Sequence, residues 1–203
     1  MLHKTLQVYV KGEELDSFSS VFEEIEKFSE TMRLSRKNSL YARLITEELL
    51  GMFSGITSKD FKALFWAEGE DNKTVFHLVA KTEMTAEKKK QLLEAASSKK
   101  NDAAVGIMGK IKDMIQNAVL NMGVIPGNEF YDAGVLENGP IDGLNLFWTL
   151  DNYRRTMENL QKEDANHPAW DELEKSIIAN VANDVHVSIK NDAVEITVFK
   201  EME

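Results

Sequence analysis

Glu48 is the residue whose position most strongly suggests chemistry. It lies inside an apolar helical pattern over residues 40–56, four residues after Leu44 and four before Met52. A carboxylate in the middle of such a face needs a donor, a cation or water, because burying it unpaired is costly. Facing a cleft, it could act as a general base; at the edge of the face, it would pair with Lys or Arg. The apolar positions are Tyr41, Leu44, Ile45, Leu49, Met52, Phe53 and Ile56.

A pair of glycines offers a second candidate site. Gly106 and Gly109 fall in the first turns of an apolar helical pattern over residues 102–122, and Lys110 follows them. Glycines at a helix N-terminus allow phosphates to approach the backbone, where the helix dipole favours negative charge. Tight packing of the helix against a neighbour would explain the same glycines. If phosphates bind, Lys110 would be the adjacent cation.

Several kinds of site are not expected. The chain has no cysteine, which excludes disulfides, thiolate metal sites and cysteine nucleophiles. Its four histidines are scattered without ligand spacing, so we expect no metal site. Neither a G-x-S-x-G motif nor a P-loop occurs.

Composition indicates a folded protein that does not bind nucleic acid. The 203 residues suit a single domain, and a hydrophobic content of 43% is enough for a substantial core. The net charge of −10 argues against binding nucleic acid. No signal peptide is recognisable and no apolar run is long enough to cross a membrane, which predicts a cytoplasmic protein without a membrane partner. Lysines at 88–90, 99 and 100 form either a solvated surface or a lid over an anionic ligand.

The elements that must position these residues follow from periodicity and turn signals. Antiparallel strands with helices on one side predict an α+β fold, a two-layer sandwich of a mostly antiparallel sheet with helices on one face. We expect helix caps near Ser39 and at Asp151, and a helix entered at Pro168 with Ile177 and Val181 inward. The expected strands are 2–10, 61–67, 74–80, 144–150, 185–189 and 194–199, and the helices span 14–32, 40–56, 85–96, 102–122, 151–162 and from 168.

This order of elements resembles the histidine-kinase-like ATPase fold, particularly the anti-sigma-factor serine kinases. The segment ITEELLGM is similar to the family helix that carries an acid, and the resemblance places that acid at Glu48. AVGIMGKI resembles the glycine-rich stretch that opens a helix after the lid, through Gly106 and Gly109. The terminal NDVHVSIKNDAVEITVFK resembles the closing hairpin of the family. Residues 123–182 are expected to be an insertion within the single domain, 1–203.

The chain departs from the family pattern where the nucleotide would be held. Met52 stands where the family has the asparagine that ligates magnesium, and Lys81 stands where an aspartate reads adenine. The resemblance therefore implies a bacterial-type regulatory protein whose nucleotide site is eroded, with weak or no binding of ATP with magnesium and no robust kinase or ATPase activity. If nucleotide binds, Glu48, Gly106, Gly109 and Lys110 would line the pocket, and the lysines at 88–100 would act as a lid.

A different class of function remains open. The same scaffold could serve as a non-catalytic module that binds a protein partner, a second copy of itself, or a small molecule. This alternative predicts an exposed apolar surface around Phe130, Tyr131, Leu146 and Trp148 in the inserted region.

Overall fold

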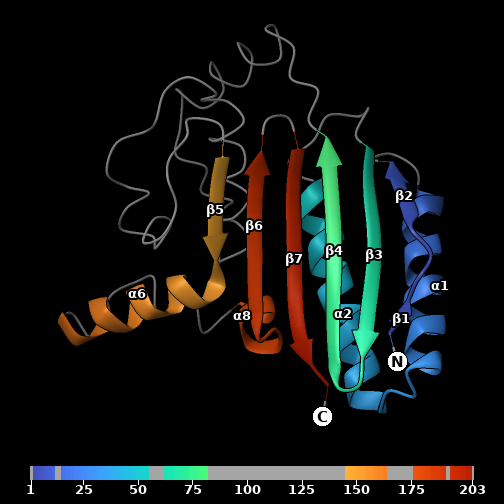
Figure 1. Ribbon diagram of the computed structural model, residues 1–203, viewed down its shortest axis with the longest axis horizontal. Coiled ribbons are helices and arrows are strands. Elements are labelled where there is room, and N and C mark those ends of the chain that lie inside the picture. The colour runs from blue at the N-terminus through green and yellow to red at the C-terminus, as the bar shows by residue number, and fades with distance from the viewer. Residues whose placement is uncertain are drawn as a thin grey trace, which may run out of the picture.

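The protein is an α+β sandwich, as the sequence predicts, and its described strands form a seven-stranded antiparallel sheet. The computed structural model describes residues 2–11, 15–54, 62–81, 145–163, 176–190 and 193–202. The strand order is β1-β3-β4-β7-β6-β5, and β2 also pairs with β3. Helices α1, α2 and α8 lie on one face of this sheet (Figure 1). Both described ends of the chain lie at the lower end of the sheet in that view.

Two β-hairpins form the centre of the sheet. Strand β3 (Lys62–Glu70) pairs with β4 (Lys73–Lys81), and β4 pairs with the last strand, β7 (Ala193–Glu201). Strand β6 (Asp184–Lys190) joins β7 on its other side, and β5 (Asn145–Thr149) forms the far edge. The β3–β4 turn consists of Asp71 and Asn72, and Asp71 adopts a positive φ of 53°. Asparagine and aspartate tolerate this left-handed region better than most residues.

The N-terminal segment forms two short strands, although the sequence predicts one. Strands β1 (His3–Lys4) and β2 (Val8–Lys11) both pair with β3. Lys4 lies opposite Glu68 and Val8 opposite Phe65, so the N-terminal segment contains one residue more than β3 between the two pairs. One extra residue on one side of a ladder is a β-bulge. The bulge divides this edge of the sheet.

Two long helices pack against the strands from the N-terminal half of the chain, β1 to β4. Helix α1 spans Leu15–Thr31 and α2 spans Arg36–Ser54. The cap of α2 that was predicted near Ser39 is wrong, because the helix starts three residues before Ser39. The Ser35 hydroxyl accepts a hydrogen bond from the Asn38 amide at 3.2 Å, which is the geometry of an N-cap.

The later helices also begin at other residues than expected. Helix α6 spans Leu150–Glu163, and the Thr149 hydroxyl, not Asp151, receives the Asn152 amide at 3.2 Å. Helix α8 is short, Ile177–Val181, and its N-cap Ser176 is extended. The prediction of one continuous helix that passes through Ser176 is therefore wrong. The prediction that Ile177 points inward is also wrong, because its side chain is 47% exposed. Pro168 lies outside the described residues.

The core lies between the helices and one face of the sheet. Alternate residues of each central strand point into it, as the period-two pattern requires. Helices α1 and α2 contribute Ile25, Phe28, Ile45 and Leu49, and the largest fully buried side chains of the strands are Phe65, Phe76 and Leu78. Strand β5 and helices α6 and α8 come from the predicted insertion, and β5 continues the same sheet.

Candidate functional site

Helix α2 places Glu48 at the edge of its apolar face and not in the middle. Glu48 is only half-buried beside the buried side of the helix, which is formed by Asn38, Ala42, Ile45, Thr46, Leu49 and Leu50. Arg43 contacts helix α1 through Glu26 at 3.2 Å. Because an α-helix turns about 100° per residue, Glu48 lies about 140° around the axis from Arg43. Its carboxylate is therefore on the flank of α2 that is turned away from α1.

The surroundings of Glu48 disfavour its charged form. Partial burial raises the pKa of its carboxyl group, and the negative charge of neighbouring Glu47 raises it further. Within the described parts of the chain, no cation or hydrogen-bond donor contacts this carboxylate. Glu47, in contrast, is exposed and pairs with Arg43 at 3.3 Å. A half-buried carboxyl with a raised pKa could accept a proton or bind a cation.

The remaining predicted site residues are outside the described residues. These are Gly106, Gly109 and Lys110, together with the lysines at 88–100. The side chain of Met52 is also outside the description, and Lys81 is described only as the last residue of β4. The structure therefore places one member of the predicted pocket, Glu48, and leaves its assembly with the others untested. Phe130, Tyr131 and the side chains of Leu146 and Trp148 likewise lie outside the described residues.

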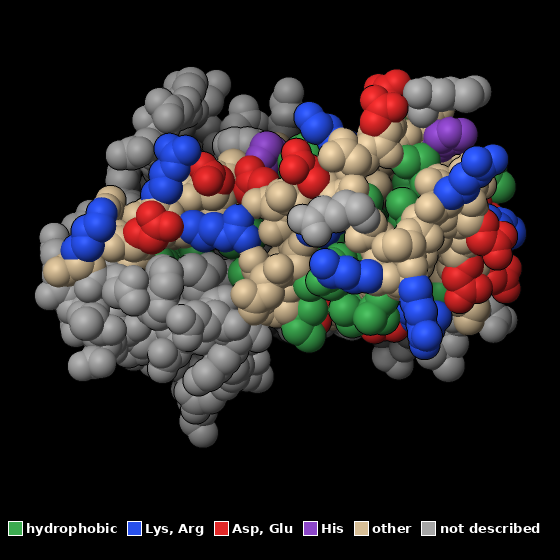
Figure 2. Space-filling model, turned by 90° about the horizontal axis from the view of Figure 1, so that it is seen from below, with side chains coloured by type: hydrophobic (Ala, Val, Ile, Leu, Met, Phe, Trp, Pro, Cys, Tyr) green, Lys and Arg blue, Asp and Glu red, His purple; other side chains and the backbone are tan. Residues whose placement is uncertain are grey.

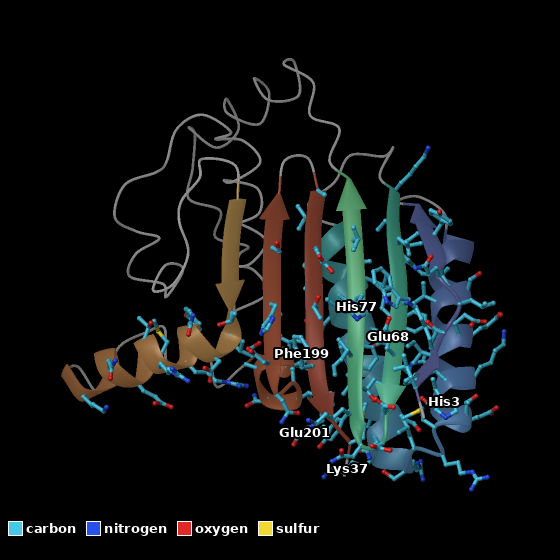
Figure 3. The ribbon with its side chains drawn as sticks, viewed as in Figure 1. His3, Lys37, Glu68, His77, Phe199 and Glu201 are labelled. Atoms are coloured by element: carbon cyan, nitrogen blue, oxygen red, sulfur yellow. The ribbon has the colours of Figure 1, made fainter. Side chains whose placement is uncertain are left out.

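A second candidate region is the sheet face that no described helix covers, which we call the open face. It is formed by alternate residues of β3, β4, β7 and β6, and it faces the viewer in Figure 3. Its central rows contain a partly exposed group of apolar and aromatic residues, bordered in the same rows by polar and charged ones. The first group is Leu64, Trp66, Val75, His77, Val79 and Phe199, and the second is Glu68, Asp184, His186, Ser188, Glu195 and Thr197.

Trp66 and His77 form a stacked pair at the centre of the open face. They are direct cross-strand neighbours, and their rings lie 4.5 Å apart with planes inclined by only 5°. Lys4 from the edge strand lies above Trp66, with its ammonium 5.3 Å from the ring centroid. The same ammonium donates to Glu68 at 2.7 Å, and the Trp66 indole N–H donates to the same carboxylate oxygen at 3.0 Å. These contacts fix the two rings in one orientation.

Two ionisable groups of this cluster, Glu68 and His77, have shifted pKa values. The hydrogen bond from Lys4 lowers the pKa of the Glu68 carboxyl, which keeps it ionised. Burial lowers the pKa of His77, and this effect outweighs the nearby charges of Glu68 and Glu195. The Nδ1 atom of His77 is buried without a hydrogen-bond partner among the described residues, and it lies 4.0 Å from Glu195 Oε1.

A second histidine lies in the same cross-strand row. His186 and His77 both pair with Thr197, from opposite sides. His186 Nε2 is 2.7 Å from Asp184 Oδ2, and its ring is 4.6 Å from that of Phe199. Asp184 Oδ1 also accepts from the Asp151 backbone amide at 3.0 Å, so the pair holds the start of α6 against β6. Its contacts indicate a structural role.

Sequence reasoning did not identify the open face as a candidate site. The alternation of residues in β3 and β4 was visible, but which set faces the helices depends on packing. The pairing of Trp66 with His77 also requires the register, which the short turn at Asp71 sets.

Neither a metal-ligand cluster nor a membrane-spanning helix is found among the described residues. They contain no group of three His, Cys, Asp or Glu side chains that could hold a metal ion. Among the described helices, none combines the length and the apolar character that a membrane span requires. Comparison of the chain with models of protein families and with curated proteins gave no match.

Proposed function

We propose that this chain is a bacterial-type regulatory protein with a histidine-kinase-like ATPase fold whose nucleotide site is eroded. The order of the described elements supports the proposal. N-terminal strands are followed by two helices, a hairpin and, at the end, a closing hairpin. The strands form one antiparallel sheet, and the helices pack behind it. The observation that supports the proposed loss of nucleotide chemistry lies on helix α2. Glu48 lies on a helix flank, and one turn later Met52 stands where a second oxygen ligand would be needed.

The residue types explain why nucleotide binding should be weak. Magnesium prefers oxygen ligands, which a thioether does not provide. Phosphoryl transfer depends almost entirely on positioning and on neutralising charge, so the loss of a metal ligand removes most of the catalytic effect. Strand β4 ends in Lys81, where the resemblance implies an aspartate. A lysine cannot accept a hydrogen bond from an adenine amino group.

Calorimetric titration with ATP and magnesium tests the proposal. We expect no heat up to millimolar nucleotide. Saturable, magnesium-dependent binding below about 1 mM that Glu48→Gln abolishes would overturn it.

The reverse experiment uses the two departures from the family pattern. Met52→Asn combined with Lys81→Asp should create measurable affinity for ATP with magnesium, because both changes restore groups that the family uses. Met52→Leu with Lys81→Met is the matched control, since it alters the same positions without supplying oxygen ligands. If both double variants behave alike, the fold assignment loses its support.

A second candidate function is a non-catalytic interaction module on the same scaffold. The observation that favours it is the exposure of apolar residues along one edge of the sheet and its open face. Leu6 and Tyr9, beside β3, are 71% and 72% exposed. Exposed apolar groups of this kind are typical of surfaces that bind a partner.

A further inference from the structure

Strand β1 is held to the sheet mainly by polar contacts. It contains only His3 and Lys4, and Thr5 is the one buried residue in the range 2–7. Leu2, before the strand, is 58% exposed. The strand lies at the lower end of the sheet edge (Figure 1), and acidic and basic side chains lie side by side at this end of the molecule (Figure 2). A segment that buries so little apolar surface can open without unfolding the rest of the chain.

Lys4 connects this strand to side chains of β3. Its ammonium donates to the Glu68 carboxylate at 2.7 Å and lies 5.3 Å from the centroid of the Trp66 ring. The Trp66 indole N–H donates to the same carboxylate oxygen at 3.0 Å. Both the carboxylate and the aromatic face attract a cation, so the docking of Lys4 depends on these two groups.

His77 lies on the other side of the same indole ring. Strand β3 lies between β1 and β4, so Lys4 and His77 approach Trp66 from opposite sides. The imidazole stacks on the indole with the ring centroids 4.5 Å apart. A charge on the imidazole would therefore lie within about 10 Å of the Lys4 ammonium, which is the screening length at 0.1 M salt. At this distance the two cations repel each other.

Charged groups face His77 from the neighbouring strands. Burial lowers the pKa of the imidazole most, the charges of Glu68 and Glu195 raise it, and the charge of Lys4 lowers it further. The hydrogen bond from Lys4 lowers the pKa of Glu68, which keeps this carboxylate ionised at about pH 5. His77 and Glu68 lie on neighbouring strands in Figure 3. The charged groups are Lys4 on β1, Glu68 on β3, Glu195 on β7 and, one strand further, the pair of His186 and Asp184 on β6.

We propose that His77 and Lys4 form a pH-sensitive latch, in which protonation of the imidazole releases Lys4 and frees strand β1 from the sheet edge. The neutral imidazole leaves Trp66 and Glu68 to Lys4. The protonated imidazole is a second cation beside the same ring and the same carboxylate, and it repels the ammonium. Glu195 Oε1 lies 4.0 Å from His77 Nδ1, which has no hydrogen-bond partner among the described residues, so the new charge gains an ion pair on β7.

The latch opens in acid. The folded pKa of His77 is below 6.5, so the docked form takes up the proton only as pH falls below this value. Detachment of Lys4 removes the repulsion and makes proton uptake easier, so a falling pH favours the detached form. Detachment frees the backbone groups of β3 that pair with β1, at Glu68 and Gly69, and an unpaired edge can accept another strand. The proposal uses no residue of α2 and is independent of nucleotide binding.

Reciprocity provides the first test. If protonation of His77 weakens the docking of Lys4, removal of Lys4 must ease protonation of His77. Lys4→Met removes the charge and keeps an unbranched side chain, so the pKa of His77 should rise in an NMR titration of the imidazole. Lys73→Met is the matched control, because Lys73 is the exposed first residue of the strand that carries His77. It should leave the titration of His77 unchanged.

Hydrogen exchange measures the release of the strand itself. The Thr5 amide donates to the Ala67 carbonyl at 2.9 Å, so its protection reports the docking of this segment. Between about pH 7 and pH 5, wild type should lose about two- to fivefold in Thr5 protection after correction for the intrinsic exchange rate. His77→Phe keeps an aromatic ring on Trp66 but cannot be protonated, so its Thr5 protection should stay constant. Amides of β4 should exchange more slowly than Thr5 at both pH values, because the release leaves the rest of the sheet folded.

The latch is rejected if Lys4→Met leaves the titration of His77 unchanged, or if the Thr5 amide is equally protected at about pH 7 and pH 5. A loss of protection that persists in His77→Phe would assign the release to another group and reject it too. Circular dichroism verifies that each variant is folded. The Lys4→Met titration stands even where His77→Phe is unfolded, because Lys4 is exposed. Calorimetry with ATP has no bearing on any of these results.

Discussion

At the scale of single residues, Glu48 is the clearest link between sequence and chemistry. Hydrophobic periodicity predicted its helix, but the apolar pattern alone placed it too centrally. The core face of α2 includes Ala42 and Thr46, both fully buried. Thr46 is buried because its hydroxyl donates to the Ala42 carbonyl at 2.8 Å, which satisfies its polar atom. A count of apolar residues ignores these two positions, so it shifts the face toward Glu48.

Replacing this carboxyl should stabilise the protein at neutral pH. The pKa of Glu48 is raised in the folded state, so the folded chain holds its proton more tightly than the unfolded chain does. Its contribution to stability is then lost as pH rises above the unfolded pKa. Glu48→Gln should raise Tm by on the order of 1–2 °C at pH 7.5 and leave it unchanged near pH 4. Differential scanning calorimetry of Glu48→Gln and of the exposed control Glu47→Gln measures both; a rise at pH 4 would contradict the argument.

His77 should make stability depend on pH in the opposite direction. Burial lowers its pKa below the ordinary value of 6.5, so the unfolded chain binds the proton more readily. Stability is then complete above pH 6.5 and falls as pH decreases through this value toward the lower folded pKa. His77→Phe keeps the stack on Trp66 and should flatten the Tm profile between about pH 7 and pH 5. His3→Gln, at the sheet edge, is the control, and an unchanged profile in His77→Phe would disprove the assignment.

At the scale of elements, the edge bulge depends on one hydroxyl group. The buried amide of Ala67 donates to the Thr5 hydroxyl at 2.9 Å, while the Thr5 amide donates back to the Ala67 carbonyl. Thr5→Val removes the acceptor but preserves the shape of the side chain, which leaves a buried N–H unpaired. We expect a loss of about 1–3 kcal/mol in the free energy of unfolding. Thr5→Ser retains the oxygen and should lose less, and urea denaturation distinguishes the two.

Helices α6 and α8 are joined by the guanidinium of Arg154. It donates to the backbone carbonyls of Ala179, Ala182 and Asn183 at and just beyond the C-terminal end of α8. This position suits both the unpaired carbonyls and the negative end of the helix dipole. Arg154→Met should cost about 1–3 kcal/mol, with faster hydrogen exchange in α8. Arg155→Met, whose side chain is exposed, is the matched control and should have little effect.

The sequence predicted most of the strands and helices that the structure describes, but not all their ends. Turn residues and alternation were enough to predict the strands of both hairpins, because these signals are local. The caps of α2 and α6 were misplaced by four and two residues, because several Ser, Thr and Asp side chains near each start could serve. Backbone dihedrals select among them, and these depend on packing. The register that places Trp66 beside His77 depends on both strands and their turn, so single-strand patterns did not reveal it.

At the scale of the whole molecule, salt should reveal how the net charge acts on association. The net charge of −10 makes two copies repel each other. Salt shortens the screening length from about 10 Å at 0.1 M to about 3 Å at 1 M. Any association of copies through exposed apolar residues should therefore strengthen with salt, and sedimentation experiments measure it. Association that weakens with salt would contradict this expectation.

The bulge at Thr5 has a further consequence, for behaviour at high concentration. Fibrils grow when a long, straight edge offers an unbroken series of amides and carbonyls to the next chain. Here the edge is divided into strands of two and four residues, and Lys11 ends the second. Short edge segments, bulges and terminal lysines all impede strand addition. This edge should therefore be a poor seed for ordered aggregates, even though Leu6 and Tyr9 are exposed along it.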